Sequence, residues 1–247
     1  LVTATVLELS GVIKDYRGLR PLRVKQLVVH PGDSIAILGL DQPMAEVFIN
    51  LITGTSLPDE GEVYVFGQPT TAVSDSGEWL ALVDRFGIVS ARAVLLQALS
   101  VIQNLSIPLT LEIEPPTDEV RARVVELARE VALPESCWPR AAGELGPAGQ
   151  ARLRVGRALA LDPEVLLLEH VTAAFSRDEV GAFAQDVRTL AARRGAAIVA
   201  ATADPDFAAA VASRVLTLEP ASGRLKQRRT GWFGRVSARI VAEGDRS

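Results

Sequence analysis

Residues 37–54, ILGLDQPMAEVFINLITG, run from an apolar strand ending in glycine into an amphipathic helix that also ends in glycine. A strand, a tight glycine turn and a helix N-terminus form a common cradle for phosphate, because backbone N–H groups and the helix dipole face the anion. Yet the turn contains two carboxylates, Asp41 and Glu46, and no lysine or arginine. The backbone pattern predicts a phosphate loop whose side chains repel phosphate.

The first N–H groups of this helix need acceptors if no phosphate lies there. Asp41 stands at the N-cap position and Glu46 falls in the first turn, so the loop can be occupied by the protein's own carboxylate. The alternative is that both acids are solvated on a surface loop.

Composition bounds the class of protein. The chain has 247 residues, 48% of them hydrophobic and 23% charged, which suits one large α/β domain or a core with an inserted subdomain. The net charge of −4 argues against general nucleic-acid binding. The single cysteine, Cys137, excludes a disulfide framework and fits a reducing compartment, and the first residues show no signal-peptide pattern.

Residues 93–111 carry no charged side chain over nearly the length of a membrane span. Polar residues such as Gln97 and Asn104, together with Pro108, disfavour a spanning helix. We therefore expect this stretch either to face an apolar partner or to form ordinary core and a hinge.

Hydrophobic periodicity predicts an alternation of strands and helices. Short β-like runs lie at 4–10, 24–29 and 61–69, and continuous apolar runs typical of doubly covered parallel strands lie at 165–168, 196–201 and 215–218. Helices are expected at 118–132, 148–160 and 178–193, the first with an apolar stripe of Val120, Val124, Leu127 and Val131. A helical middle from about 92 to 160 thus separates two strand-rich parts.

Three longer stretches carry a family resemblance. They are LPDEGEVYVFGQP at 57–69, ELGPAGQARLRVGRALALDPEVLLLEHVTAAF at 144–175 and ATADPDFAAAVASRVLTLEPASGRL at 201–225. In this order they resemble the nucleotide-binding subunit of ATP-binding-cassette (ABC) transporters, where the second stretch is the signature helix running into the Walker B strand. The resemblance covers about residues 5–225, and the phrase GRALALDPEVLLL is its most specific part.

The resemblance implies an α/β fold of the P-loop NTPase type. This ABC ATPase fold has a three-layer core with a mostly parallel sheet, an antiparallel β subdomain and an inserted helical subdomain. Residues 1–91 and 161–225 are expected to form the core with its antiparallel part, residues 92–160 the helical signature subdomain, and residues 226–247 a basic amphipathic tail.

The family's phosphate loop is G-x-x-G-x-G-K-[ST]-[ST], whose N–H groups wrap the phosphates, whose lysine neutralises them and whose hydroxyl holds magnesium. Gly39 matches the first glycine. The later glycines are Gln42 and Met44, the lysine is Ala45, and the hydroxyl positions are Glu46 and Val47.

The other chemical positions have also changed. The magnesium-sensing glutamine is Ala91, the Walker B aspartate is Glu169, the general-base glutamate is His170 and the switch histidine is Ala203. The signature LSGGQ becomes Leu145, Gly146, Pro147, Ala148 and Gly149, although a one-residue shift would restore Gly149-Gln150 as its end. The serine–alanine–leucine–aspartate loop after the base becomes Ala173, Ala174, Phe175 and Ser176.

These substitutions predict a large loss of triphosphate affinity. One pair of unit charges about 5 Å apart is worth roughly 3 kcal/mol at an effective dielectric of about 20. Losing the lysine and gaining a carboxylate therefore costs several kcal/mol, on the order of a thousandfold in affinity. Tyr16 stands where the family stacks a ring on adenine, worth about 1–3 kcal/mol, which does not offset that loss; its alternative role is a partly buried surface tyrosine.

Scaffold positions survive, such as residues 159–163, whereas positions that touch phosphate, metal or water are replaced. We expect a catalytically inactive cassette that serves as a structural or regulatory partner. We expect no cofactor and no metal site, with hydrolysis disfavoured because His170 can act as a base but has no phosphate cradle. The alternatives are a divergent, active ATPase with weak ATP and magnesium binding, and a soluble scaffold without a permease.

The expected partners are a membrane permease, a homologous ABC subunit in a dimer, or both, and no nucleic acid. This places the protein in the cytoplasm, peripheral to the inner face of the membrane. In the tail, Trp232, Phe233, Val236 and Ile240 alternate with arginines in a short amphipathic pattern. Residues 226–241 are expected to contact the membrane surface or a partner helix; the alternatives are that they pack back on the domain or are disordered.

Overall fold

The computed structural model describes residues 5–73 and 75–227. Its first half builds a four-stranded antiparallel sheet in the order β2-β1-β4-β5. The strands are β1 (Leu7–Lys14), β2 (Leu22–Val29), β4 (Glu60–Val65) and β5 (Gln68–Pro69). Alternate residues of β1 and β2 are buried, as expected for a sheet with one face in the core.

A second sheet has six strands in the order β10-β9-β3-β8-β7-β6. Its strands are β3 (Ser34–Leu38), β6 (Phe86–Ser90), β7 (Val165–Glu169), β8 (Ala197–Ala201), β9 (Arg214–Glu219) and β10 (Arg224–Gln227). All neighbours pair in parallel except β9 and β10. The predicted parallel strands at 165–168, 196–201 and 215–218 are confirmed as β7, β8 and β9.

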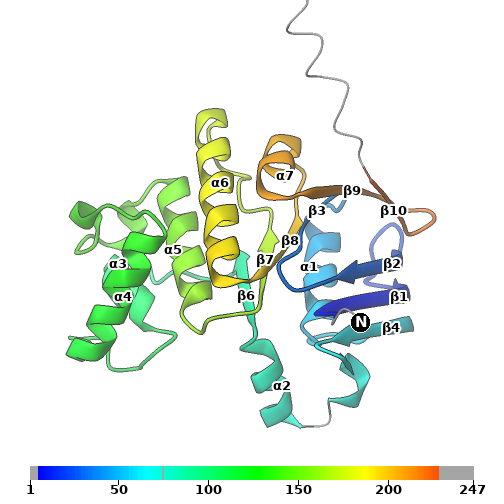
Figure 1. The fold of residues 1–247 in the computed structure, drawn as a ribbon, viewed down its shortest axis with the longest axis horizontal. Helices are drawn as coiled ribbons and strands as arrows, with labels where there is room; N and C mark the ends of the chain where they lie inside the picture. The colour runs from blue at the N-terminus through cyan, green and yellow to red at the C-terminus, as the bar shows by residue number, and fades with distance from the viewer. Residues whose placement is uncertain (1–4, 74, 228–247) are drawn as a thin grey trace, which may run out of the picture.

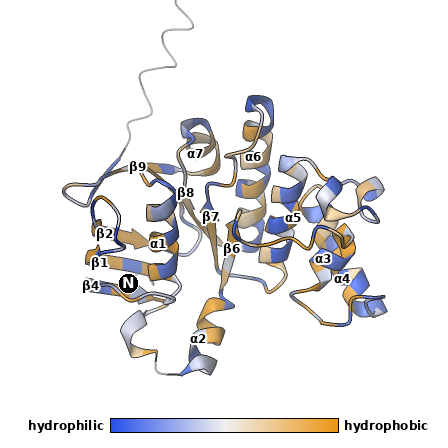
Figure 2. Ribbon diagram, turned by 180° about the vertical axis from the view of Figure 1, so that it is seen from behind, coloured by the Kyte–Doolittle hydropathy of each residue, from blue (hydrophilic) through white to orange (hydrophobic). Residues whose placement is uncertain are grey.

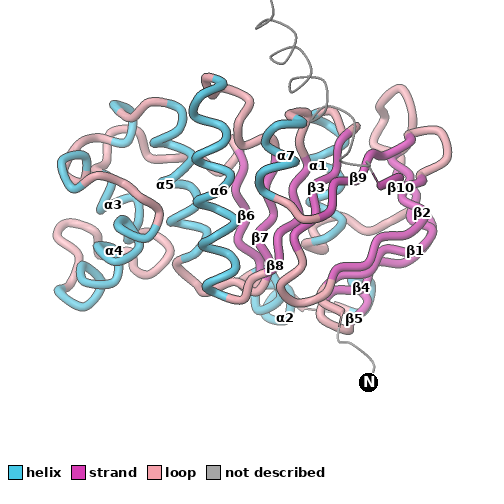
Figure 3. Tube along the Cα trace, turned by 45° about the horizontal axis from the view of Figure 1, so that its top comes forward, coloured by secondary structure: helices cyan, strands magenta, loops and turns pink. Residues whose placement is uncertain are grey.

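The parallel sheet is covered on both faces, which explains its continuous apolar runs. Ile35 and Ile37 of β3 face a core shared with α1 and the antiparallel sheet, while Ala36 and Leu38 face a core made with the later helices. Figure 2 shows apolar residues along β7 and β8 in the middle of the molecule. The result is the layered arrangement of Figure 3, with the antiparallel strands at one end and α3, α4 and α5 at the other.

Seven α-helices lie in the described residues. They are α1 (Gln42–Ile52), α2 (Ser76–Val83), α3 (Val101–Ser106), α4 (Asp118–Glu130), α5 (Pro147–Leu159), α6 (Arg177–Arg194) and α7 (Pro205–Val211). Figure 1 shows α3 and α4 to one side of the sheet, with α5 and α6 lying between them and the sheet. The predicted apolar stripe of α4 is confirmed, since Val124 and Leu127 are fully buried.

Arg194 fastens the helical part to the core. Its guanidinium lies 2.6 Å from Asp162, which precedes β7, and also pairs with Glu130 at the end of α4. Because Arg194 of α6 pairs with both Asp162 and Glu130, ion pairs connect the helical part to the core in addition to their common hydrophobic cluster.

The sequence patterns missed several boundaries. β1 starts at Leu7 rather than residue 4 and continues to Lys14, α2 and β6 were not predicted, and β10 includes Lys226 and Gln227. The rest of the predicted tail, including Trp232, lies outside the described residues. Within the described chain no helix combines the length and apolar character needed to cross a membrane.

Candidate functional site

The backbone conformation and packing of the loop after β3 require the glycine at position 39. Gly39 has φ of +91°, a conformation that other residues rarely adopt. A Cβ atom there would also lie 2.9 Å from the carbonyl oxygen of Leu218 in β9. The packing of the neighbouring strand therefore requires glycine at this position.

Asp41 caps the helix that follows. Its carboxylate accepts a hydrogen bond of 2.9 Å from the N–H of Met44 at the start of α1, so the predicted capping contact is present. Glu46 does not share this role. Its side chain turns instead to Arg92, 3.1 Å away.

Replacing Asp41 with alanine is expected to lower the free energy of unfolding by about 1 kcal/mol, because the N–H of Met44 loses its acceptor. Asp41→Asn keeps an acceptor oxygen and should lose less than half as much in the same urea titration. Equal losses for the two variants would show that charge, rather than the cap, accounts for the effect.

Arg92 is the centre of the site, and no sequence motif pointed to it. It follows β6, and its guanidinium contacts Glu169 at the end of β7 through two hydrogen bonds, Nε to Oε1 at 3.2 Å and Nη2 to Oε2 at 2.6 Å. Its Nη1 lies 3.1 Å from the carboxylate of Glu46 in α1. One cation therefore joins two acidic residues from two different elements.

Glu169 is fully satisfied inside the protein. Its side chain is 0% exposed, and besides Arg92 it accepts a 2.6 Å hydrogen bond from the amide of Gln42 in α1. The bond to Glu169 is the largest reason why the pKa of Arg92 is raised. A buried carboxylate needs a hydrogen-bonding or cationic partner. Burial of Glu169 at the end of a core strand therefore predicts a cation nearby, but the sequence does not say which residue supplies it.

The positions that hold ATP and magnesium in the family make internal contacts in this structure. The family's metal is held at the positions of Glu46 and Glu169, and here a guanidinium bridges both. The lysine position, Ala45, is 0% exposed and forms part of the hydrophobic core. Among the described residues, no three His, Cys, Asp or Glu side chains are close enough to share a metal ion.

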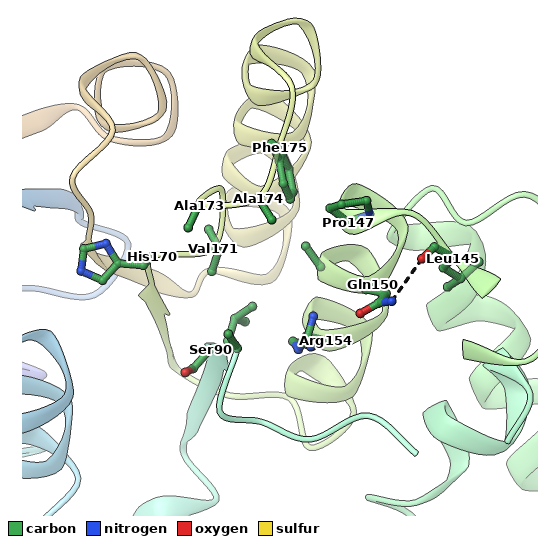
Figure 4. Close-up of a pocket in the computed structure, with 13 residues that line it drawn as sticks. Ser90, Leu145, Pro147, Gln150, Arg154, His170, Val171, Ala173, Ala174 and Phe175 are labelled. Atoms are coloured by element: carbon green, nitrogen blue, oxygen red, sulfur yellow. Dashed lines mark hydrogen bonds between the residues drawn. The ribbon is translucent and has the colours of Figure 1, made fainter. Parts of the chain in front are cut away.

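His170 occupies a strained turn after β7. Its φ is +44°, and its Nε2 is buried without a hydrogen-bond partner among the described residues. Figure 4 shows its ring directed away from Gln150 and Arg154.

The switch position and the residues around it have a structural role. Ala203 is exposed and carries no polar group. The next residue, Asp204, caps α7 and accepts a 3.0 Å hydrogen bond from the hydroxyl of Thr172. This contact joins the loops after β7 and β8.

The predicted signature residues lie at the start of α5. Gly146 is the N-cap and makes no side-chain cap bond, and Pro147 opens the helix. Gln150 folds back to donate a 3.1 Å hydrogen bond to the carbonyl of Leu145. Ala91, the predicted magnesium-sensing position, is exposed beside this helix and lines the pocket drawn in Figure 4.

Tyr16 is partly buried against the core under the antiparallel sheet. Its ring folds over its own turn, since a Cβ on Gly18 would lie 2.5 Å from the ring edge. Burial, and secondarily the charge of Asp41, raises the pKa of Tyr16. These contacts match the alternative of a partly buried tyrosine.

The fold is that of the ATPase cassette of ABC transporters, which confirms the predicted fold class. The cbiO1 protein of Clostridium perfringens, part of the ABC transporter complex cbiONQ, matches with a TM-score of 0.77 and 20% identity over 97% of this chain and 92% of that protein. The MJ0796 cassette, a dimer bound to ADP and Pi, matches with a TM-score of 0.73 and 24% identity over 91% and 100%.

Similar sequences have related names. The methionine import ATP-binding protein MetN of Brucella abortus is 26% identical over 219 residues, and the lipoprotein-releasing system ATP-binding protein LolD of Chromohalobacter salexigens is 26% identical over 226 residues. The matches cover 88% and 90% of this chain, which spans 58% of the MetN length and 93% of the LolD length. No protein-family model matches the chain. The relatives and structural neighbours are thus ATP-binding subunits of ABC transporters.

Proposed function

We propose that the chain is an ABC-transporter cassette subunit in which an internal ion-pair network replaces nucleotide. The observation that supports this most is the guanidinium of Arg92 bridging Glu46 and Glu169. ATP with magnesium would have to displace this cation and leave three carboxylates, Asp41 included, facing a polyphosphate. Repulsion at such distances costs several kcal/mol.

The test is calorimetric titration of the purified full chain with ATP and magnesium. We expect no saturable heat at millimolar nucleotide, while an intact cassette measured in the same buffer binds. Saturable binding below about 1 mM, which is roughly −4 kcal/mol, would contradict the proposal.

The competing function is a divergent, active ATPase. It is favoured by the names of the relatives, which are ATP-binding proteins of import and release systems. It requires both nucleotide affinity and magnesium-dependent phosphate release, so the same titration followed by a phosphate assay distinguishes the two functions.

The proposed partner is a membrane permease, which would place the subunit at the inner face of the membrane. The loop between β6 and α3 exposes Val94 at 70% and Leu96 at 46%. Arg157 and Arg154 of α5 donate hydrogen bonds to the carbonyls of Val94 and Ala93, which fixes the loop in place. The part of this loop after Arg92, residues 93–100, has no charged side chain. A fixed, uncharged segment with exposed apolar side chains suits docking to another protein.

We expect Val94→Glu combined with Leu96→Glu to abolish co-purification with a permease from detergent-solubilised native membranes. Leu161→Glu, at a site that is 47% exposed elsewhere on the surface, is the matched control and should leave co-purification unchanged. If the tagged wild-type chain recovers no membrane protein, a scaffold without a permease becomes the better explanation. A homologous cassette recovered with the chain would instead favour a dimer, as in MJ0796.

A further inference from the structure

A pocket of about 260 Å³ lies between the core and the helical subdomain. The core contributes the ends of β6 and β7 and the loop that leads to α6, and the helical side contributes α5 and the residue before its cap. Figure 4 shows Leu145, Gln150 and Arg154 on one side of it and Val171 and Phe175 on the other. The pocket borders the network around Arg92 through Ser90, Ala91 and His170, but the side chains of Arg92, Glu46 and Glu169 do not line it.

The pocket holds an uncompensated positive charge. Arg154 is partly buried, and the one hydrogen bond that its side chain makes to a described residue runs from Nε to the carbonyl of Ala93 at 3.1 Å. Arg157, one turn further along α5, likewise bonds a carbonyl, that of Val94 at 2.7 Å. Neither forms an ion pair within the described residues, and no Asp or Glu lines the pocket.

This differs from the neighbouring arginine on the same helix. Arg152 forms an ion pair of 2.6 Å with Asp186 on α6. Burial, together with the charge of Arg157, lowers the pKa of Arg154. Arg154 is thus a partly buried cation near a second cation, and among the described residues its two terminal guanidinium nitrogens have no acceptor and no anion pairs with it.

We propose that this pocket binds a compact organic monoanion, with a carboxylate against Arg154 and the amide of Gln150. Its apolar body would lie between Leu145, Val171 and Phe175. Apolar walls with a few convergent polar groups are the usual make-up of a small-molecule site. Such a ligand would connect the core to the helical subdomain.

The volume of the pocket and the charge of its lining restrict the class of ligand that it can bind. An apolar cavity of about 150 Å³ holds benzene, so 260 Å³ takes one ring or a short branched chain with a carboxylate. A nucleoside triphosphate is too large. A zwitterion or cation is disfavoured because the lining offers no carboxylate to an ammonium group.

The probe is benzoate, titrated into the isotopically labelled full chain and followed by amide chemical shifts. We expect saturable shifts from residues 145–154 and 171–175, and binding of the neutral isostere benzamide at least about tenfold weaker, because a charge-assisted hydrogen bond is lost. Equal binding of benzoate and benzamide, or no saturation by benzoate at tens of millimolar, would overturn the proposal.

Two variants locate the site. Arg154→Gln should weaken benzoate binding at least about tenfold, whereas Arg188→Gln, an exposed arginine on α6 with no ion pair among the described residues, should leave it unchanged. Because Arg154→Gln also removes the bond to Ala93, Ala174→Phe provides a second test that fills the pocket from an exposed position. Wild-type affinity in a folded Ala174→Phe protein would refute the assignment. The proposal does not depend on whether the chain binds ATP.

Discussion

Replacing Arg92 with methionine should lower the free energy of unfolding by about 2–3 kcal/mol in urea at neutral pH. The variant leaves Glu169, whose side chain is 0% exposed, without the cation that pairs with it. Removing one partner of a buried pair costs about 3–5 kcal/mol. The expected value is lower because Arg92 is itself 38% exposed and Gln42 still donates to Glu169.

Two controls isolate the buried charge. Adding Glu169→Gln to the Arg92→Met protein should recover most of the lost stability, because no ionised group is then stranded. Arg140→Met breaks an exposed pair with Glu144, whose members are 49% and 56% exposed, and should cost less than about 1 kcal/mol. If Arg92→Met costs no more than Arg140→Met, the network does not hold the site together.

The second large effect is a gain of nucleotide affinity. A variant with Gln42→Gly, Met44→Gly, Ala45→Lys, Glu46→Ser and Arg92→Gln should bind ATP with magnesium about a thousandfold or more tighter than the wild-type chain. The glycines free the backbone to approach phosphate, the lysine restores a cation, and loss of Arg92 releases Glu169 towards the metal position.

Partial variants separate the contributions. The same protein with Ala45 retained should lose most of the gain, because the terminal phosphates then meet no lysine. The same protein with Arg92 retained should also bind weakly, because the guanidinium still contacts Glu169. Full affinity in the Arg92-retaining protein would show that the internal cation does not block the site.

The sequence predicted the fold well wherever hydrophobic periodicity was strong. The runs of β7, β8 and β9, and helices α4 to α6, were placed within a few residues, because burial on one or both faces imposes their patterns. Helix α2 was missed because its packing face is short: of its residues only Leu82 is buried. β10 was missed because its polar residues are held by pairing with β9 rather than by burial.

The sequence predicted the positions and the helix cap of the site, but not the ion pairs around Arg92. The residues at the family's chemical positions could be named in order along the chain, and the cap by Asp41 followed from helix geometry alone. The contact of Arg92 with Glu46 and Glu169 could not be predicted from the sequence, because those residues lie 46 and 77 positions away along the chain. Only the meeting of β6, β7 and α1 in the folded protein brings them together.

The crowding of Gly39 against Leu218 has a bearing on other divergent cassettes. Since the packing against Leu218 demands a residue without a side chain there, a glycine at this position is not by itself a sign of nucleotide binding. A lineage could lose every nucleotide contact and still be unable to mutate that position.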